Sequence, residues 1–479
     1  MRTGLAVADV DGWAEPATAF AALADEPRAF WLDDPSGTSW VGTGGVVVDS
    51  VAGIRDALGA GGALVGWIGY EARAETMGEP ILRTERFPRV ALMRVTGVLR
   101  FDHAARRVTA YGAVPDPSAG ESRPPDPSPR ASGPSASGPP EPSSPEPRAA
   151  TWADDDARYL AAIRACLDRI RDGDAYQLCL TTEVRVNGPV DPDAAYRRLR
   201  ALTPAHHGGL VRVDGVALAS ASPERFLRIA GGRVETSPIK GTRPRSADPA
   251  TDADLAADLL ASAKERAENT MIVDLMRNDL GRIAVPGTVA VEALHAVESY
   301  PAVHQLVSTI SATLRPGVDV VDVLGATFPA GSMTGAPKLA ATRILDGLER
   351  RARGVYAGAF GWIDAEPTEG GLDTEGGLDT EGGRDTEGGL DTEGGLGTEG
   401  GLGTEGGLDT EGGLDWGADL AMVIRSIVTD AAGAVVGTGG GITASSVPGE
   451  ELAEVKLKAA APLAALGAAP PPPPPPHPV

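Results

Sequence analysis

The sequence predicts an α+β protein in which large antiparallel or mixed β-sheets are sandwiched by helices. Stretches of strand character alternate along the chain with amphipathic stretches of helical period. Several strand-like stretches also follow one another closely enough to form hairpins, which favours α+β over a parallel α/β fold. Hydrophobic residues make up 42% of the 479 positions, which is sufficient for a large buried core.

Three segments are not expected to contribute to that core. Residues 115–150 contain twelve of the forty prolines and residues 467–479 contain eight more, so we predict a flexible linker and a tail. Residues 368–415 repeat the hexapeptide Thr-Glu-Gly-Gly-Leu-Asp, with near variants, eight times. We predict that this insertion is disordered, with a β-helix or a calcium-binding repeat as the alternative. The rest divides into a β-rich region, 1–114, and a larger region, 151–466.

Charge and composition exclude several classes of partner. The net charge is −23, and the eight Glu, six Asp and one Arg of the hexapeptide repeats account for −13 of it. The remainder is mildly acidic, which argues against nucleic acid and anionic membranes as partners. No apolar stretch is long enough to span a membrane, and the first twenty residues do not resemble a signal peptide. With two cysteines, the chain fits a reducing cytoplasm.

Local patterns predict the individual elements. Before the linker, strand-like alternation is found at 64–71, 90–99 and 107–114. Just after the linker, Thr151 to Asp154 resembles a capping box that opens a helix. Further strands are expected at 176–186, 210–221, 226–229, 232–239, 285–291, 355–363, 420–428 and 434–436. Further helices are expected at 193–202, 255–280, 303–314, from the Gly-rich loop 328–338 through 348, and at 450–466.

Lys240 has the setting of a nucleophile. It follows the strand-like run 232–239 and is followed by Gly241 and by two arginines, Arg243 and Arg245. Burial and neighbouring cations both favour the neutral form of a lysine, and a neutral amine is a nucleophile. Taken alone, the segment is more typical of a turn with basic residues on its rim. Other motifs have to decide between the two interpretations.

Three glutamates could form a metal site. Glu268 lies on a predicted helix, and Glu451 and Glu454 share one face of the last helix. Carboxylates from two helices suit a hard cation such as Mg²⁺, although most such glutamates are solvated surface residues.

Two further segments could bind an anion. Residues 439–441 are three consecutive glycines, which form either a turn or a backbone surface that a carboxylate can approach. Ser332 precedes a predicted helix, which it either caps or equips to bind an anion.

Taken in order, the motifs resemble those of the chorismate-utilising enzymes. The matching stretches are Ser222-Pro223-Glu224-Arg225-Phe226, Pro238-Ile239-Lys240-Gly241-Thr242, Ala267-Glu268-Asn269, 274–281, 303–308, Gly335-Ala336-Pro337-Lys338, Ile424-Arg425 and Gly439-Gly440-Gly441-Ile442. Within the family, anthranilate synthases typically have alanine where this chain has Lys240. The sequence Pro-Ile-Lys-Gly-Thr is similar to the one found in the family branch called aminodeoxychorismate synthase component I. The resemblance implies the family's fold and a transferase that aminates chorismate at C4, giving 4-amino-4-deoxychorismate for p-aminobenzoate and folate synthesis.

The resemblance also implies residue roles. Mg²⁺ would be held by Glu268 and Glu454, with Glu451 nearby, and would bind the ring carboxylate of chorismate. Lys240 would add to the ring at C2 while Glu224 protonates the departing C4 hydroxyl, and ammonia would then add at C4 and expel the lysine. The remaining substrate-binding and catalytic candidates are Arg425, Gly440 and Gly441 for the enolpyruvyl carboxylate, Ser332 and Thr242, and His304 near the leaving group.

One departure concerns the substrate site. Where the family usually has Gly-Tyr, this chain has Gly361-Trp362, so we expect a hydroxyl near the enolpyruvyl carboxylate to be missing.

The source of ammonia is expected to be a separate glutamine amidotransferase subunit. Cys166 lies on a predicted helix and Cys179 inside a predicted strand, and neither has the surrounding glycines typical of an amidotransferase nucleophile. Two alternatives stay open at this point. One is anthranilate synthase component I, and the other is a non-catalytic protein that binds partners through its acidic repeats.

Overall fold

The computed structural model describes residues 6–10, 12–35, 37–114, 148–300, 303–365 and 416–468. The predictions for the hexapeptide insertion, and for most of the linker and the tail, therefore fall outside the described residues.

Two antiparallel sheets share one long strand. β5 (Val90–Asp102) pairs along one edge with β3 (Thr38–Val48) and along the other with β4 (Ala63–Ile68) and β6 (Arg107–Gly112). From β3 the first sheet continues through β2 (Arg28–Asp33), β9 (His207–Val213), β10 (Val216–Ser222), β19 (Ser426–Asp430), β20 (Gly433–Thr443) and β8 (Gln177–Asn187). From β4 the second continues through β17 (Ala359–Asp364), β18 (Gly417–Met422), β11 (Arg225–Ala230), β12 (Arg233–Thr236) and β15 (Val303–Thr313).

Short strands complete the edges of the two sheets. β1 (Val7–Val10) pairs with β6, and β7 (Ala150–Trp152) and β16 (Gly335–Ala336) pair with β8. β13 (Ile239–Pro244) and β14 (Ala290–Ser299) pair with β15. All these pairings are antiparallel, so the predicted fold class is confirmed.

A core rich in aromatic residues fills the space between the sheets. Phe30 of β2, Trp67 of β4 and Phe360 of β17 are almost fully buried within one hydrophobic cluster. Trp362 belongs to the same cluster, with its ring centroid 5.3 Å from that of Trp40. The side chains of this cluster come from both sides of the linker, so the regions 1–114 and 151–466 are packed together.

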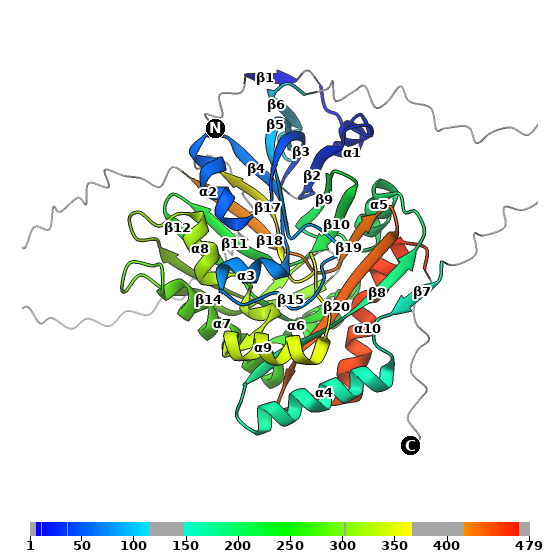
Figure 1. Cartoon of the computed structure of the whole chain (residues 1–479), viewed down its shortest axis with the longest axis vertical. Helices are drawn as coiled ribbons and strands as arrows, with labels where there is room; N and C mark the ends of the chain where they lie inside the picture. The colour runs from blue at the N-terminus through cyan, green and yellow to red at the C-terminus, as the bar shows by residue number, and fades with distance from the viewer. Residues whose placement is uncertain are drawn as a thin grey trace, which may run out of the picture.

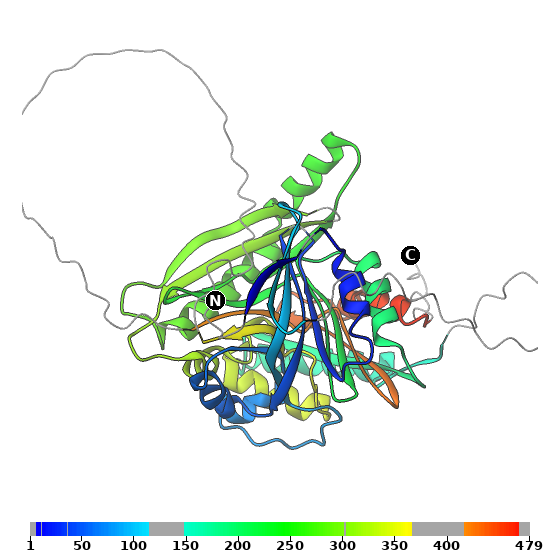
Figure 2. The ribbon, with the colours of Figure 1, turned by 90° about the horizontal axis from the view of Figure 1, so that it is seen from above.

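Helices cover the outer faces of both sheets (Figure 1). The first sheet is covered by α1 (Pro16–Ala21), α5 (Pro192–Leu202) and α10 (Pro448–Ala465), and beside them α4 (Asp156–Arg171) and α9 (Lys338–Glu349) pack on β8. The second sheet is covered by α2 (Val51–Gly59), α7 (Ala263–Gly281) and α8 (Val320–Thr327), with α3 (Arg73–Thr76) nearby. α6 (Pro249–Ala261) projects from the body of the molecule, in green in Figure 2.

The predicted helix at 303–314 is wrong, because residues 303–313 form β15, an inner strand of the second sheet between β12 and β14. β12 and β13 pair with one edge of β15, and β14 pairs with the other. Nearly all of its side chains are buried, so both faces are covered and the polar–apolar alternation that marks a half-buried strand is missing. Its β-branched residues, including Val303, Val307 and Ile310, were the sequence feature that favours a strand over a helix.

The long helix predicted at 255–280 is interrupted at Ser262. The Ser262 side chain accepts a hydrogen bond from the backbone N–H of Glu265 and so caps α7, separating it from α6. Ser262 and Glu265 have the spacing of a capping box, which the periodicity argument overlooked. Similarly, residues 150–152 form β7, and the cap of α4 is Asp155 rather than Thr151.

Three strand predictions need adjustment. The stretch 210–221 is a hairpin, with Asp214 and Gly215 at positive φ in the turn between β9 and β10. The stretch 420–428 is divided between β18 and β19 near Arg425, which also has positive φ. The strand expected at 285–291 is displaced along the chain and forms β14.

Within the described ranges, no helix combines the length and the apolar character that crossing a membrane requires.

Candidate active site

Lys240 lies among groups supplied by distant parts of the chain. It belongs to β13, opposite Leu306 of β15, at a bulge where Gly241 adopts a φ of 78°. A Cβ atom placed on Gly441 of β20 would lie 3.6 Å from Lys240 Nζ and 2.9 Å from Nε2 of Gln177. Within the described part of the chain, Nζ has no ion pair or hydrogen bond. The amine is therefore free to meet a bound molecule at the glycine strand.

The three consecutive glycines lie inside β20 and do not form a turn. Gly439, Gly440 and Gly441 pair with residues 179–181 of β8. A Cβ atom on Gly440 would come within 3.3 Å of Oε2 of Glu451. The absence of side chains therefore leaves the backbone open to Lys240 on one side and to α10 on the other.

Glu224 is a buried carboxyl close to Lys240. It follows β10, is 7% exposed, and accepts a hydrogen bond of 3.0 Å from the hydroxyl of Ser332. Burial raises the pKa of Glu224 to about 7, against the opposing charge of Lys240 and the hydrogen bond from Ser332. A carboxyl with this pKa can donate a proton near neutral pH, which is what a general acid requires.

Glu268, Glu451 and Glu454 influence one another electrostatically. Burial and neighbouring carboxylates raise the pKa values of Glu268 and Glu451. Burial also acts to raise the pKa of Glu454. The ion pair with Lys458, whose Nζ lies 2.7 Å from Oε1, and the charges of Lys264 and Lys240 together outweigh burial, so the net shift of this pKa is downward.

The ammonium of Lys264 lies among these three carboxylates. Lys264 Nζ is 3.7 Å from Glu451 Oε1. Burial lowers the pKa of Lys264, but the charges of Glu451, Glu268 and Glu454 raise it by more. In the part of the chain that the structure describes, no three His, Cys, Asp or Glu side chains are placed closely enough to hold a metal. The carboxylate oxygens of the three glutamates are ligands of the kind that Mg²⁺ prefers. In this structure the ammonium of Lys264 balances part of their negative charge.

Arg425 and Tyr356 form a second polar group beside β20. Burial lowers the pKa of Arg425, against the opposing effects of Tyr356 and Glu454. Tyr356 is 8% exposed and its ring occupies the space that a side chain at position 437 would need. Trp362 lies in the core between the sheets, whereas Tyr356 is close enough to Arg425 to influence its pKa. The missing hydroxyl near the enolpyruvyl carboxylate stays a prediction.

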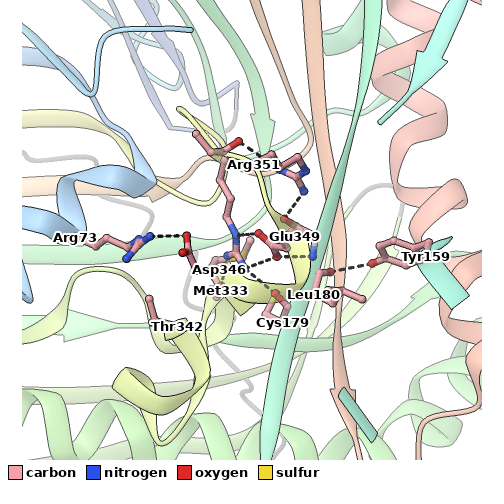
Figure 3. A network of polar contacts seen from close by, with 12 residues as sticks. Arg73, Tyr159, Cys179, Leu180, Met333, Thr342, Asp346, Glu349 and Arg351 are labelled. Carbon is pink, nitrogen blue, oxygen red and sulfur yellow. Dashed lines mark hydrogen bonds and ion pairs between the residues drawn. The ribbon is translucent and has the colours of Figure 1, made fainter. Parts of the chain in front are cut away.

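A buried ion pair between Arg353 and Glu349 joins three segments beside the site, and Figure 3 shows Glu349 close to Cys179 and Met333. Arg353 forms a 2.8 Å ion pair with Glu349 and donates to the carbonyl oxygens of Cys179, in β8, and Met333. Glu349 in turn accepts a hydrogen bond from the backbone N–H of Thr181. These contacts join β8, the end of α9 and the short helix η3 (Gly331–Met333), which carries Ser332.

Other predicted residues have different surroundings. Arg243 pairs with Asp258 and Arg245 with Asp252, both of α6, so these arginines are not free to act on Lys240 as the sequence suggested. Thr242 is exposed beyond the bulge of β13.

His304 already has a partner on each ring nitrogen. Nδ1 is 2.8 Å from Ser299 Oγ and Nε2 is 3.0 Å from Asp252 Oδ1. The residue lies two positions from Leu306, the partner of Lys240 in the sheet. Its catalytic role stays a prediction.

Gln177 was not identified from the sequence. It is fully buried at the start of β8, and neither its Nε2 nor its Oε1 has a hydrogen-bond partner among the described residues. Unpaired buried amides are rare, and this one faces the space beside Gly441 and Lys240. The position of this polar residue just before the apolar run Leu178-Cys179-Leu180 was the available signal.

Comparisons with known proteins place this geometry in context. The sequence profile of a family described as chorismate binding enzyme matches residues 33–372 and 410–464. An aminodeoxychorismate synthase of Streptomyces pristinaespiralis is 37% identical over 417 residues, which cover 84% of this chain and 50% of that protein. Component 1 of the anthranilate synthase of Haloferax volcanii is also 37% identical, over 309 residues that cover 63% of this chain and 59% of that protein.

The chain spans about half the length of the first curated relatives it matches. Among solved structures, anthranilate synthase component I from Streptococcus pneumoniae TIGR4 superposes with a TM-score of 0.64. The superposition covers 96% of this chain and 92% of that one, at 23% identity, and so establishes a shared fold.

The ion pair between Arg353 and Glu349 predicts a large effect on stability. Glu349→Ala leaves the buried guanidinium of Arg353 without its partner, so we expect the free energy of unfolding to fall by about 3–5 kcal/mol in urea titrations. Asp168→Ala removes the partner of Arg171 from an exposed pair and should change it by less than about 1 kcal/mol. Equal effects of the two variants would contradict a structural role for the pair.

Glu224 predicts a pH-dependent difference in stability. Its pKa is raised from 4.5 to about 7 on folding, so its contribution to stability is fully present below pH 4.5 and is lost as the pH rises through about 7. Glu224→Gln cannot ionise. The free energy of unfolding of the wild type, relative to this variant, should therefore fall by about 3 kcal/mol between pH 4.5 and about pH 8. If the difference in free energy of unfolding between the wild type and Glu224→Gln does not change with pH, the Glu224 carboxyl is solvated and its pKa is not raised.

Proposed function

We propose a reaction for this chain on the premise that it belongs to the chorismate binding enzyme family. The reaction is the amination of chorismate at C4, in which ammonia replaces the hydroxyl group and the products are 4-amino-4-deoxychorismate and water. We place it in the cytoplasm, as a step toward p-aminobenzoate. The observation that carries the proposal is the position of Lys240 between the buried carboxyl of Glu224 and the glycine strand.

Glu224 would act as the general acid. The C4 hydroxyl is a poor leaving group and needs a proton as its bond to carbon breaks. Because the carboxyl is buried and its pKa is about 7, a substantial fraction is protonated at neutral pH. The hydroxyl of Ser332 fixes the orientation of the carboxyl by donating to Oε1.

Lys240 would act as the nucleophile. Its amine would add at C2 of the ring, the double bonds would shift, and the C4 hydroxyl would leave as water after taking the proton of Glu224. Ammonia would then add at C4 as the bond between C2 and Lys240 breaks, which regenerates the lysine amine. The proton lost by the new ammonium group at C4 would restore the carboxyl of Glu224. Covalent catalysis of this kind divides one difficult substitution into two easier steps.

Two carboxylates of the substrate require cationic partners. Arg425, with the backbone of Gly440 and Gly441, would bind the enolpyruvyl carboxylate. Glu268 and Glu454, with Glu451 nearby, would hold Mg²⁺, which when bound would attract the ring carboxylate. For the ion to bind, the ammonium of Lys264 would have to move away from Glu451.

Ammonia would come from a glutamine amidotransferase partner. The two cysteines of the chain are both buried, and burial raises the pKa of Cys166 to about 12 and also raises that of Cys179. Thiols in this state are poor nucleophiles, which supports the view that glutamine is hydrolysed elsewhere.

The rival function is that of anthranilate synthase component I. Sequence identity does not separate the two, since relatives of both names are 37% identical to the chain. Lys240 favours amination at C4, because a covalent bond at C2 blocks the position that anthranilate formation has to aminate.

Product analysis tests the proposal. The purified chain, incubated with chorismate, Mg²⁺ and ammonium, should release 4-amino-4-deoxychorismate, identified by mass spectrometry and chromatography against both standards. With glutamine in place of ammonium, the chain by itself should form no product. Release of anthranilate would establish the rival function, and no turnover at all would favour a binding protein.

Lys240 variants test covalent catalysis. Arginine keeps the positive charge but cannot lose its proton, so Lys240→Arg and Lys240→Ala should both lose C4 amination while still binding chorismate. Lys456→Arg, at a half-buried lysine that pairs with the exposed Asp156, keeps the charge and should behave as the wild type. Intact-protein mass spectrometry of wild type with chorismate and no ammonia should show the adduct. An arginine variant that aminates at nearly the wild-type rate would reduce Lys240 to an electrostatic role.

A further inference from the structure

A polar cavity lies beside the half of β8 that is farther from Gln177. It has a volume of about 190 Å³ and is bounded by the ends of β8 and β20, by residues 83–87, and by the turn after α9. Along β8, Arg185 in the cavity wall is six residues beyond Cys179, a distance of about 20 Å in an extended strand. The cavity therefore extends away from Lys240, although Arg353 in its lining also donates to the carbonyl oxygen of Cys179.

Arginine dominates the lining of this cavity. One glutamate, Glu183, lines it together with six arginines: Arg83, Arg86, Arg185, Arg350, Arg351 and Arg353. The concentration of positive charge is unusual because the whole chain carries a net charge of −23.

Only half of these arginines have carboxylate partners among the described residues. Arg86 pairs with Asp430 at 2.5 Å, Arg185 with Glu183 at 2.5 Å, and Arg353 with Glu349 at 2.8 Å.

The other three, Arg83, Arg350 and Arg351, form no ion pair within the described part of the chain and contact only neutral oxygens. The Nε atoms of Arg83 and Arg351 are buried there without any hydrogen-bond partner. A buried N–H donor without an acceptor lowers the stability of a protein. A bound molecule with several oxygen atoms could supply the acceptors that these arginines lack.

We propose that this cavity binds a small multivalent oxyanion, with a phosphate monoester as the simplest ligand. Guanidinium groups match phosphate oxygens with paired hydrogen bonds, and several of them around one cavity favour more than one negative charge. The volume is below that of most drug-sized sites, so a single phosphate with a small organic group fits better than a nucleotide. The site is independent of the chemistry proposed for Lys240.

Isothermal titration with inorganic phosphate tests the proposal, with ionic strength held constant by chloride. The full chain should bind one phosphate, and Arg83→Gln and Arg350→Gln should each weaken binding about tenfold, since each removes a charged hydrogen-bond donor. Arg277→Gln removes the same charge from an exposed helical pair and should leave the affinity unchanged. Neither Arg83 nor Arg350 belongs to the candidate active site, so amination should be unaffected in both variants.

Three outcomes would overturn the proposal. The first is the absence of binding at millimolar phosphate, and the second is equal binding by the wild type and the Arg83→Gln/Arg350→Gln double variant. The third is phosphate binding that emerges only after deletion of residues 368–415, because the acidic repeats would then be the natural occupant. Citrate, titrated in parallel, separates a general requirement for several negative charges from a preference for phosphate.

Discussion

The candidate active site depends on the buried pair of Arg353 and Glu349. A guanidinium removed from water has to be neutralised and hydrogen-bonded, and here its donors reach Glu349 and the carbonyl oxygens of Cys179 and Met333. These acceptors belong to segments that meet only in the folded state. The pair therefore fixes β8 against the loop that carries Ser332, and Ser332 in turn orients Glu224. Through these contacts, the buried charge of Arg353 helps to fix the position of the Glu224 carboxyl.

Short motifs made much of the site predictable from the sequence. Lys240 and Glu224 stand in compact segments whose residue types indicate their chemistry, and the structure brings both together with Gly441. The same is true of Glu268 and Glu451, although their charges are balanced by Lys264. The α+β class was predictable as well, because strands and helices follow one another in recognisable lengths.

What could not be predicted depends on pairing between distant strands. β15 is buried on both faces, so its sequence lacks the alternation that distinguishes a strand from a helix. The importance of Gln177 and Tyr356 arises only because β8 and β20 pair and bring Gly441 and Gly437 against them. Arg243 and Arg245 illustrate the opposite case, since their proximity to Lys240 in sequence did not reveal their partners on α6.

The hairpin of β17 and β18 has a consequence for how the chain can vary. Asp364 and Gly417 are paired at its end, so the two points between which the hexapeptide repeats are inserted are fixed by the sheet itself. Closing a longer or shorter loop across them changes the free energy only with the logarithm of its length. Gain or loss of whole repeat units, as replication slippage in a repetitive gene would produce, is therefore compatible with the same register and the same core. We therefore expect the sheet to accept a segment of variable length between Asp364 and Gly417 without any change to Lys240 or Glu224.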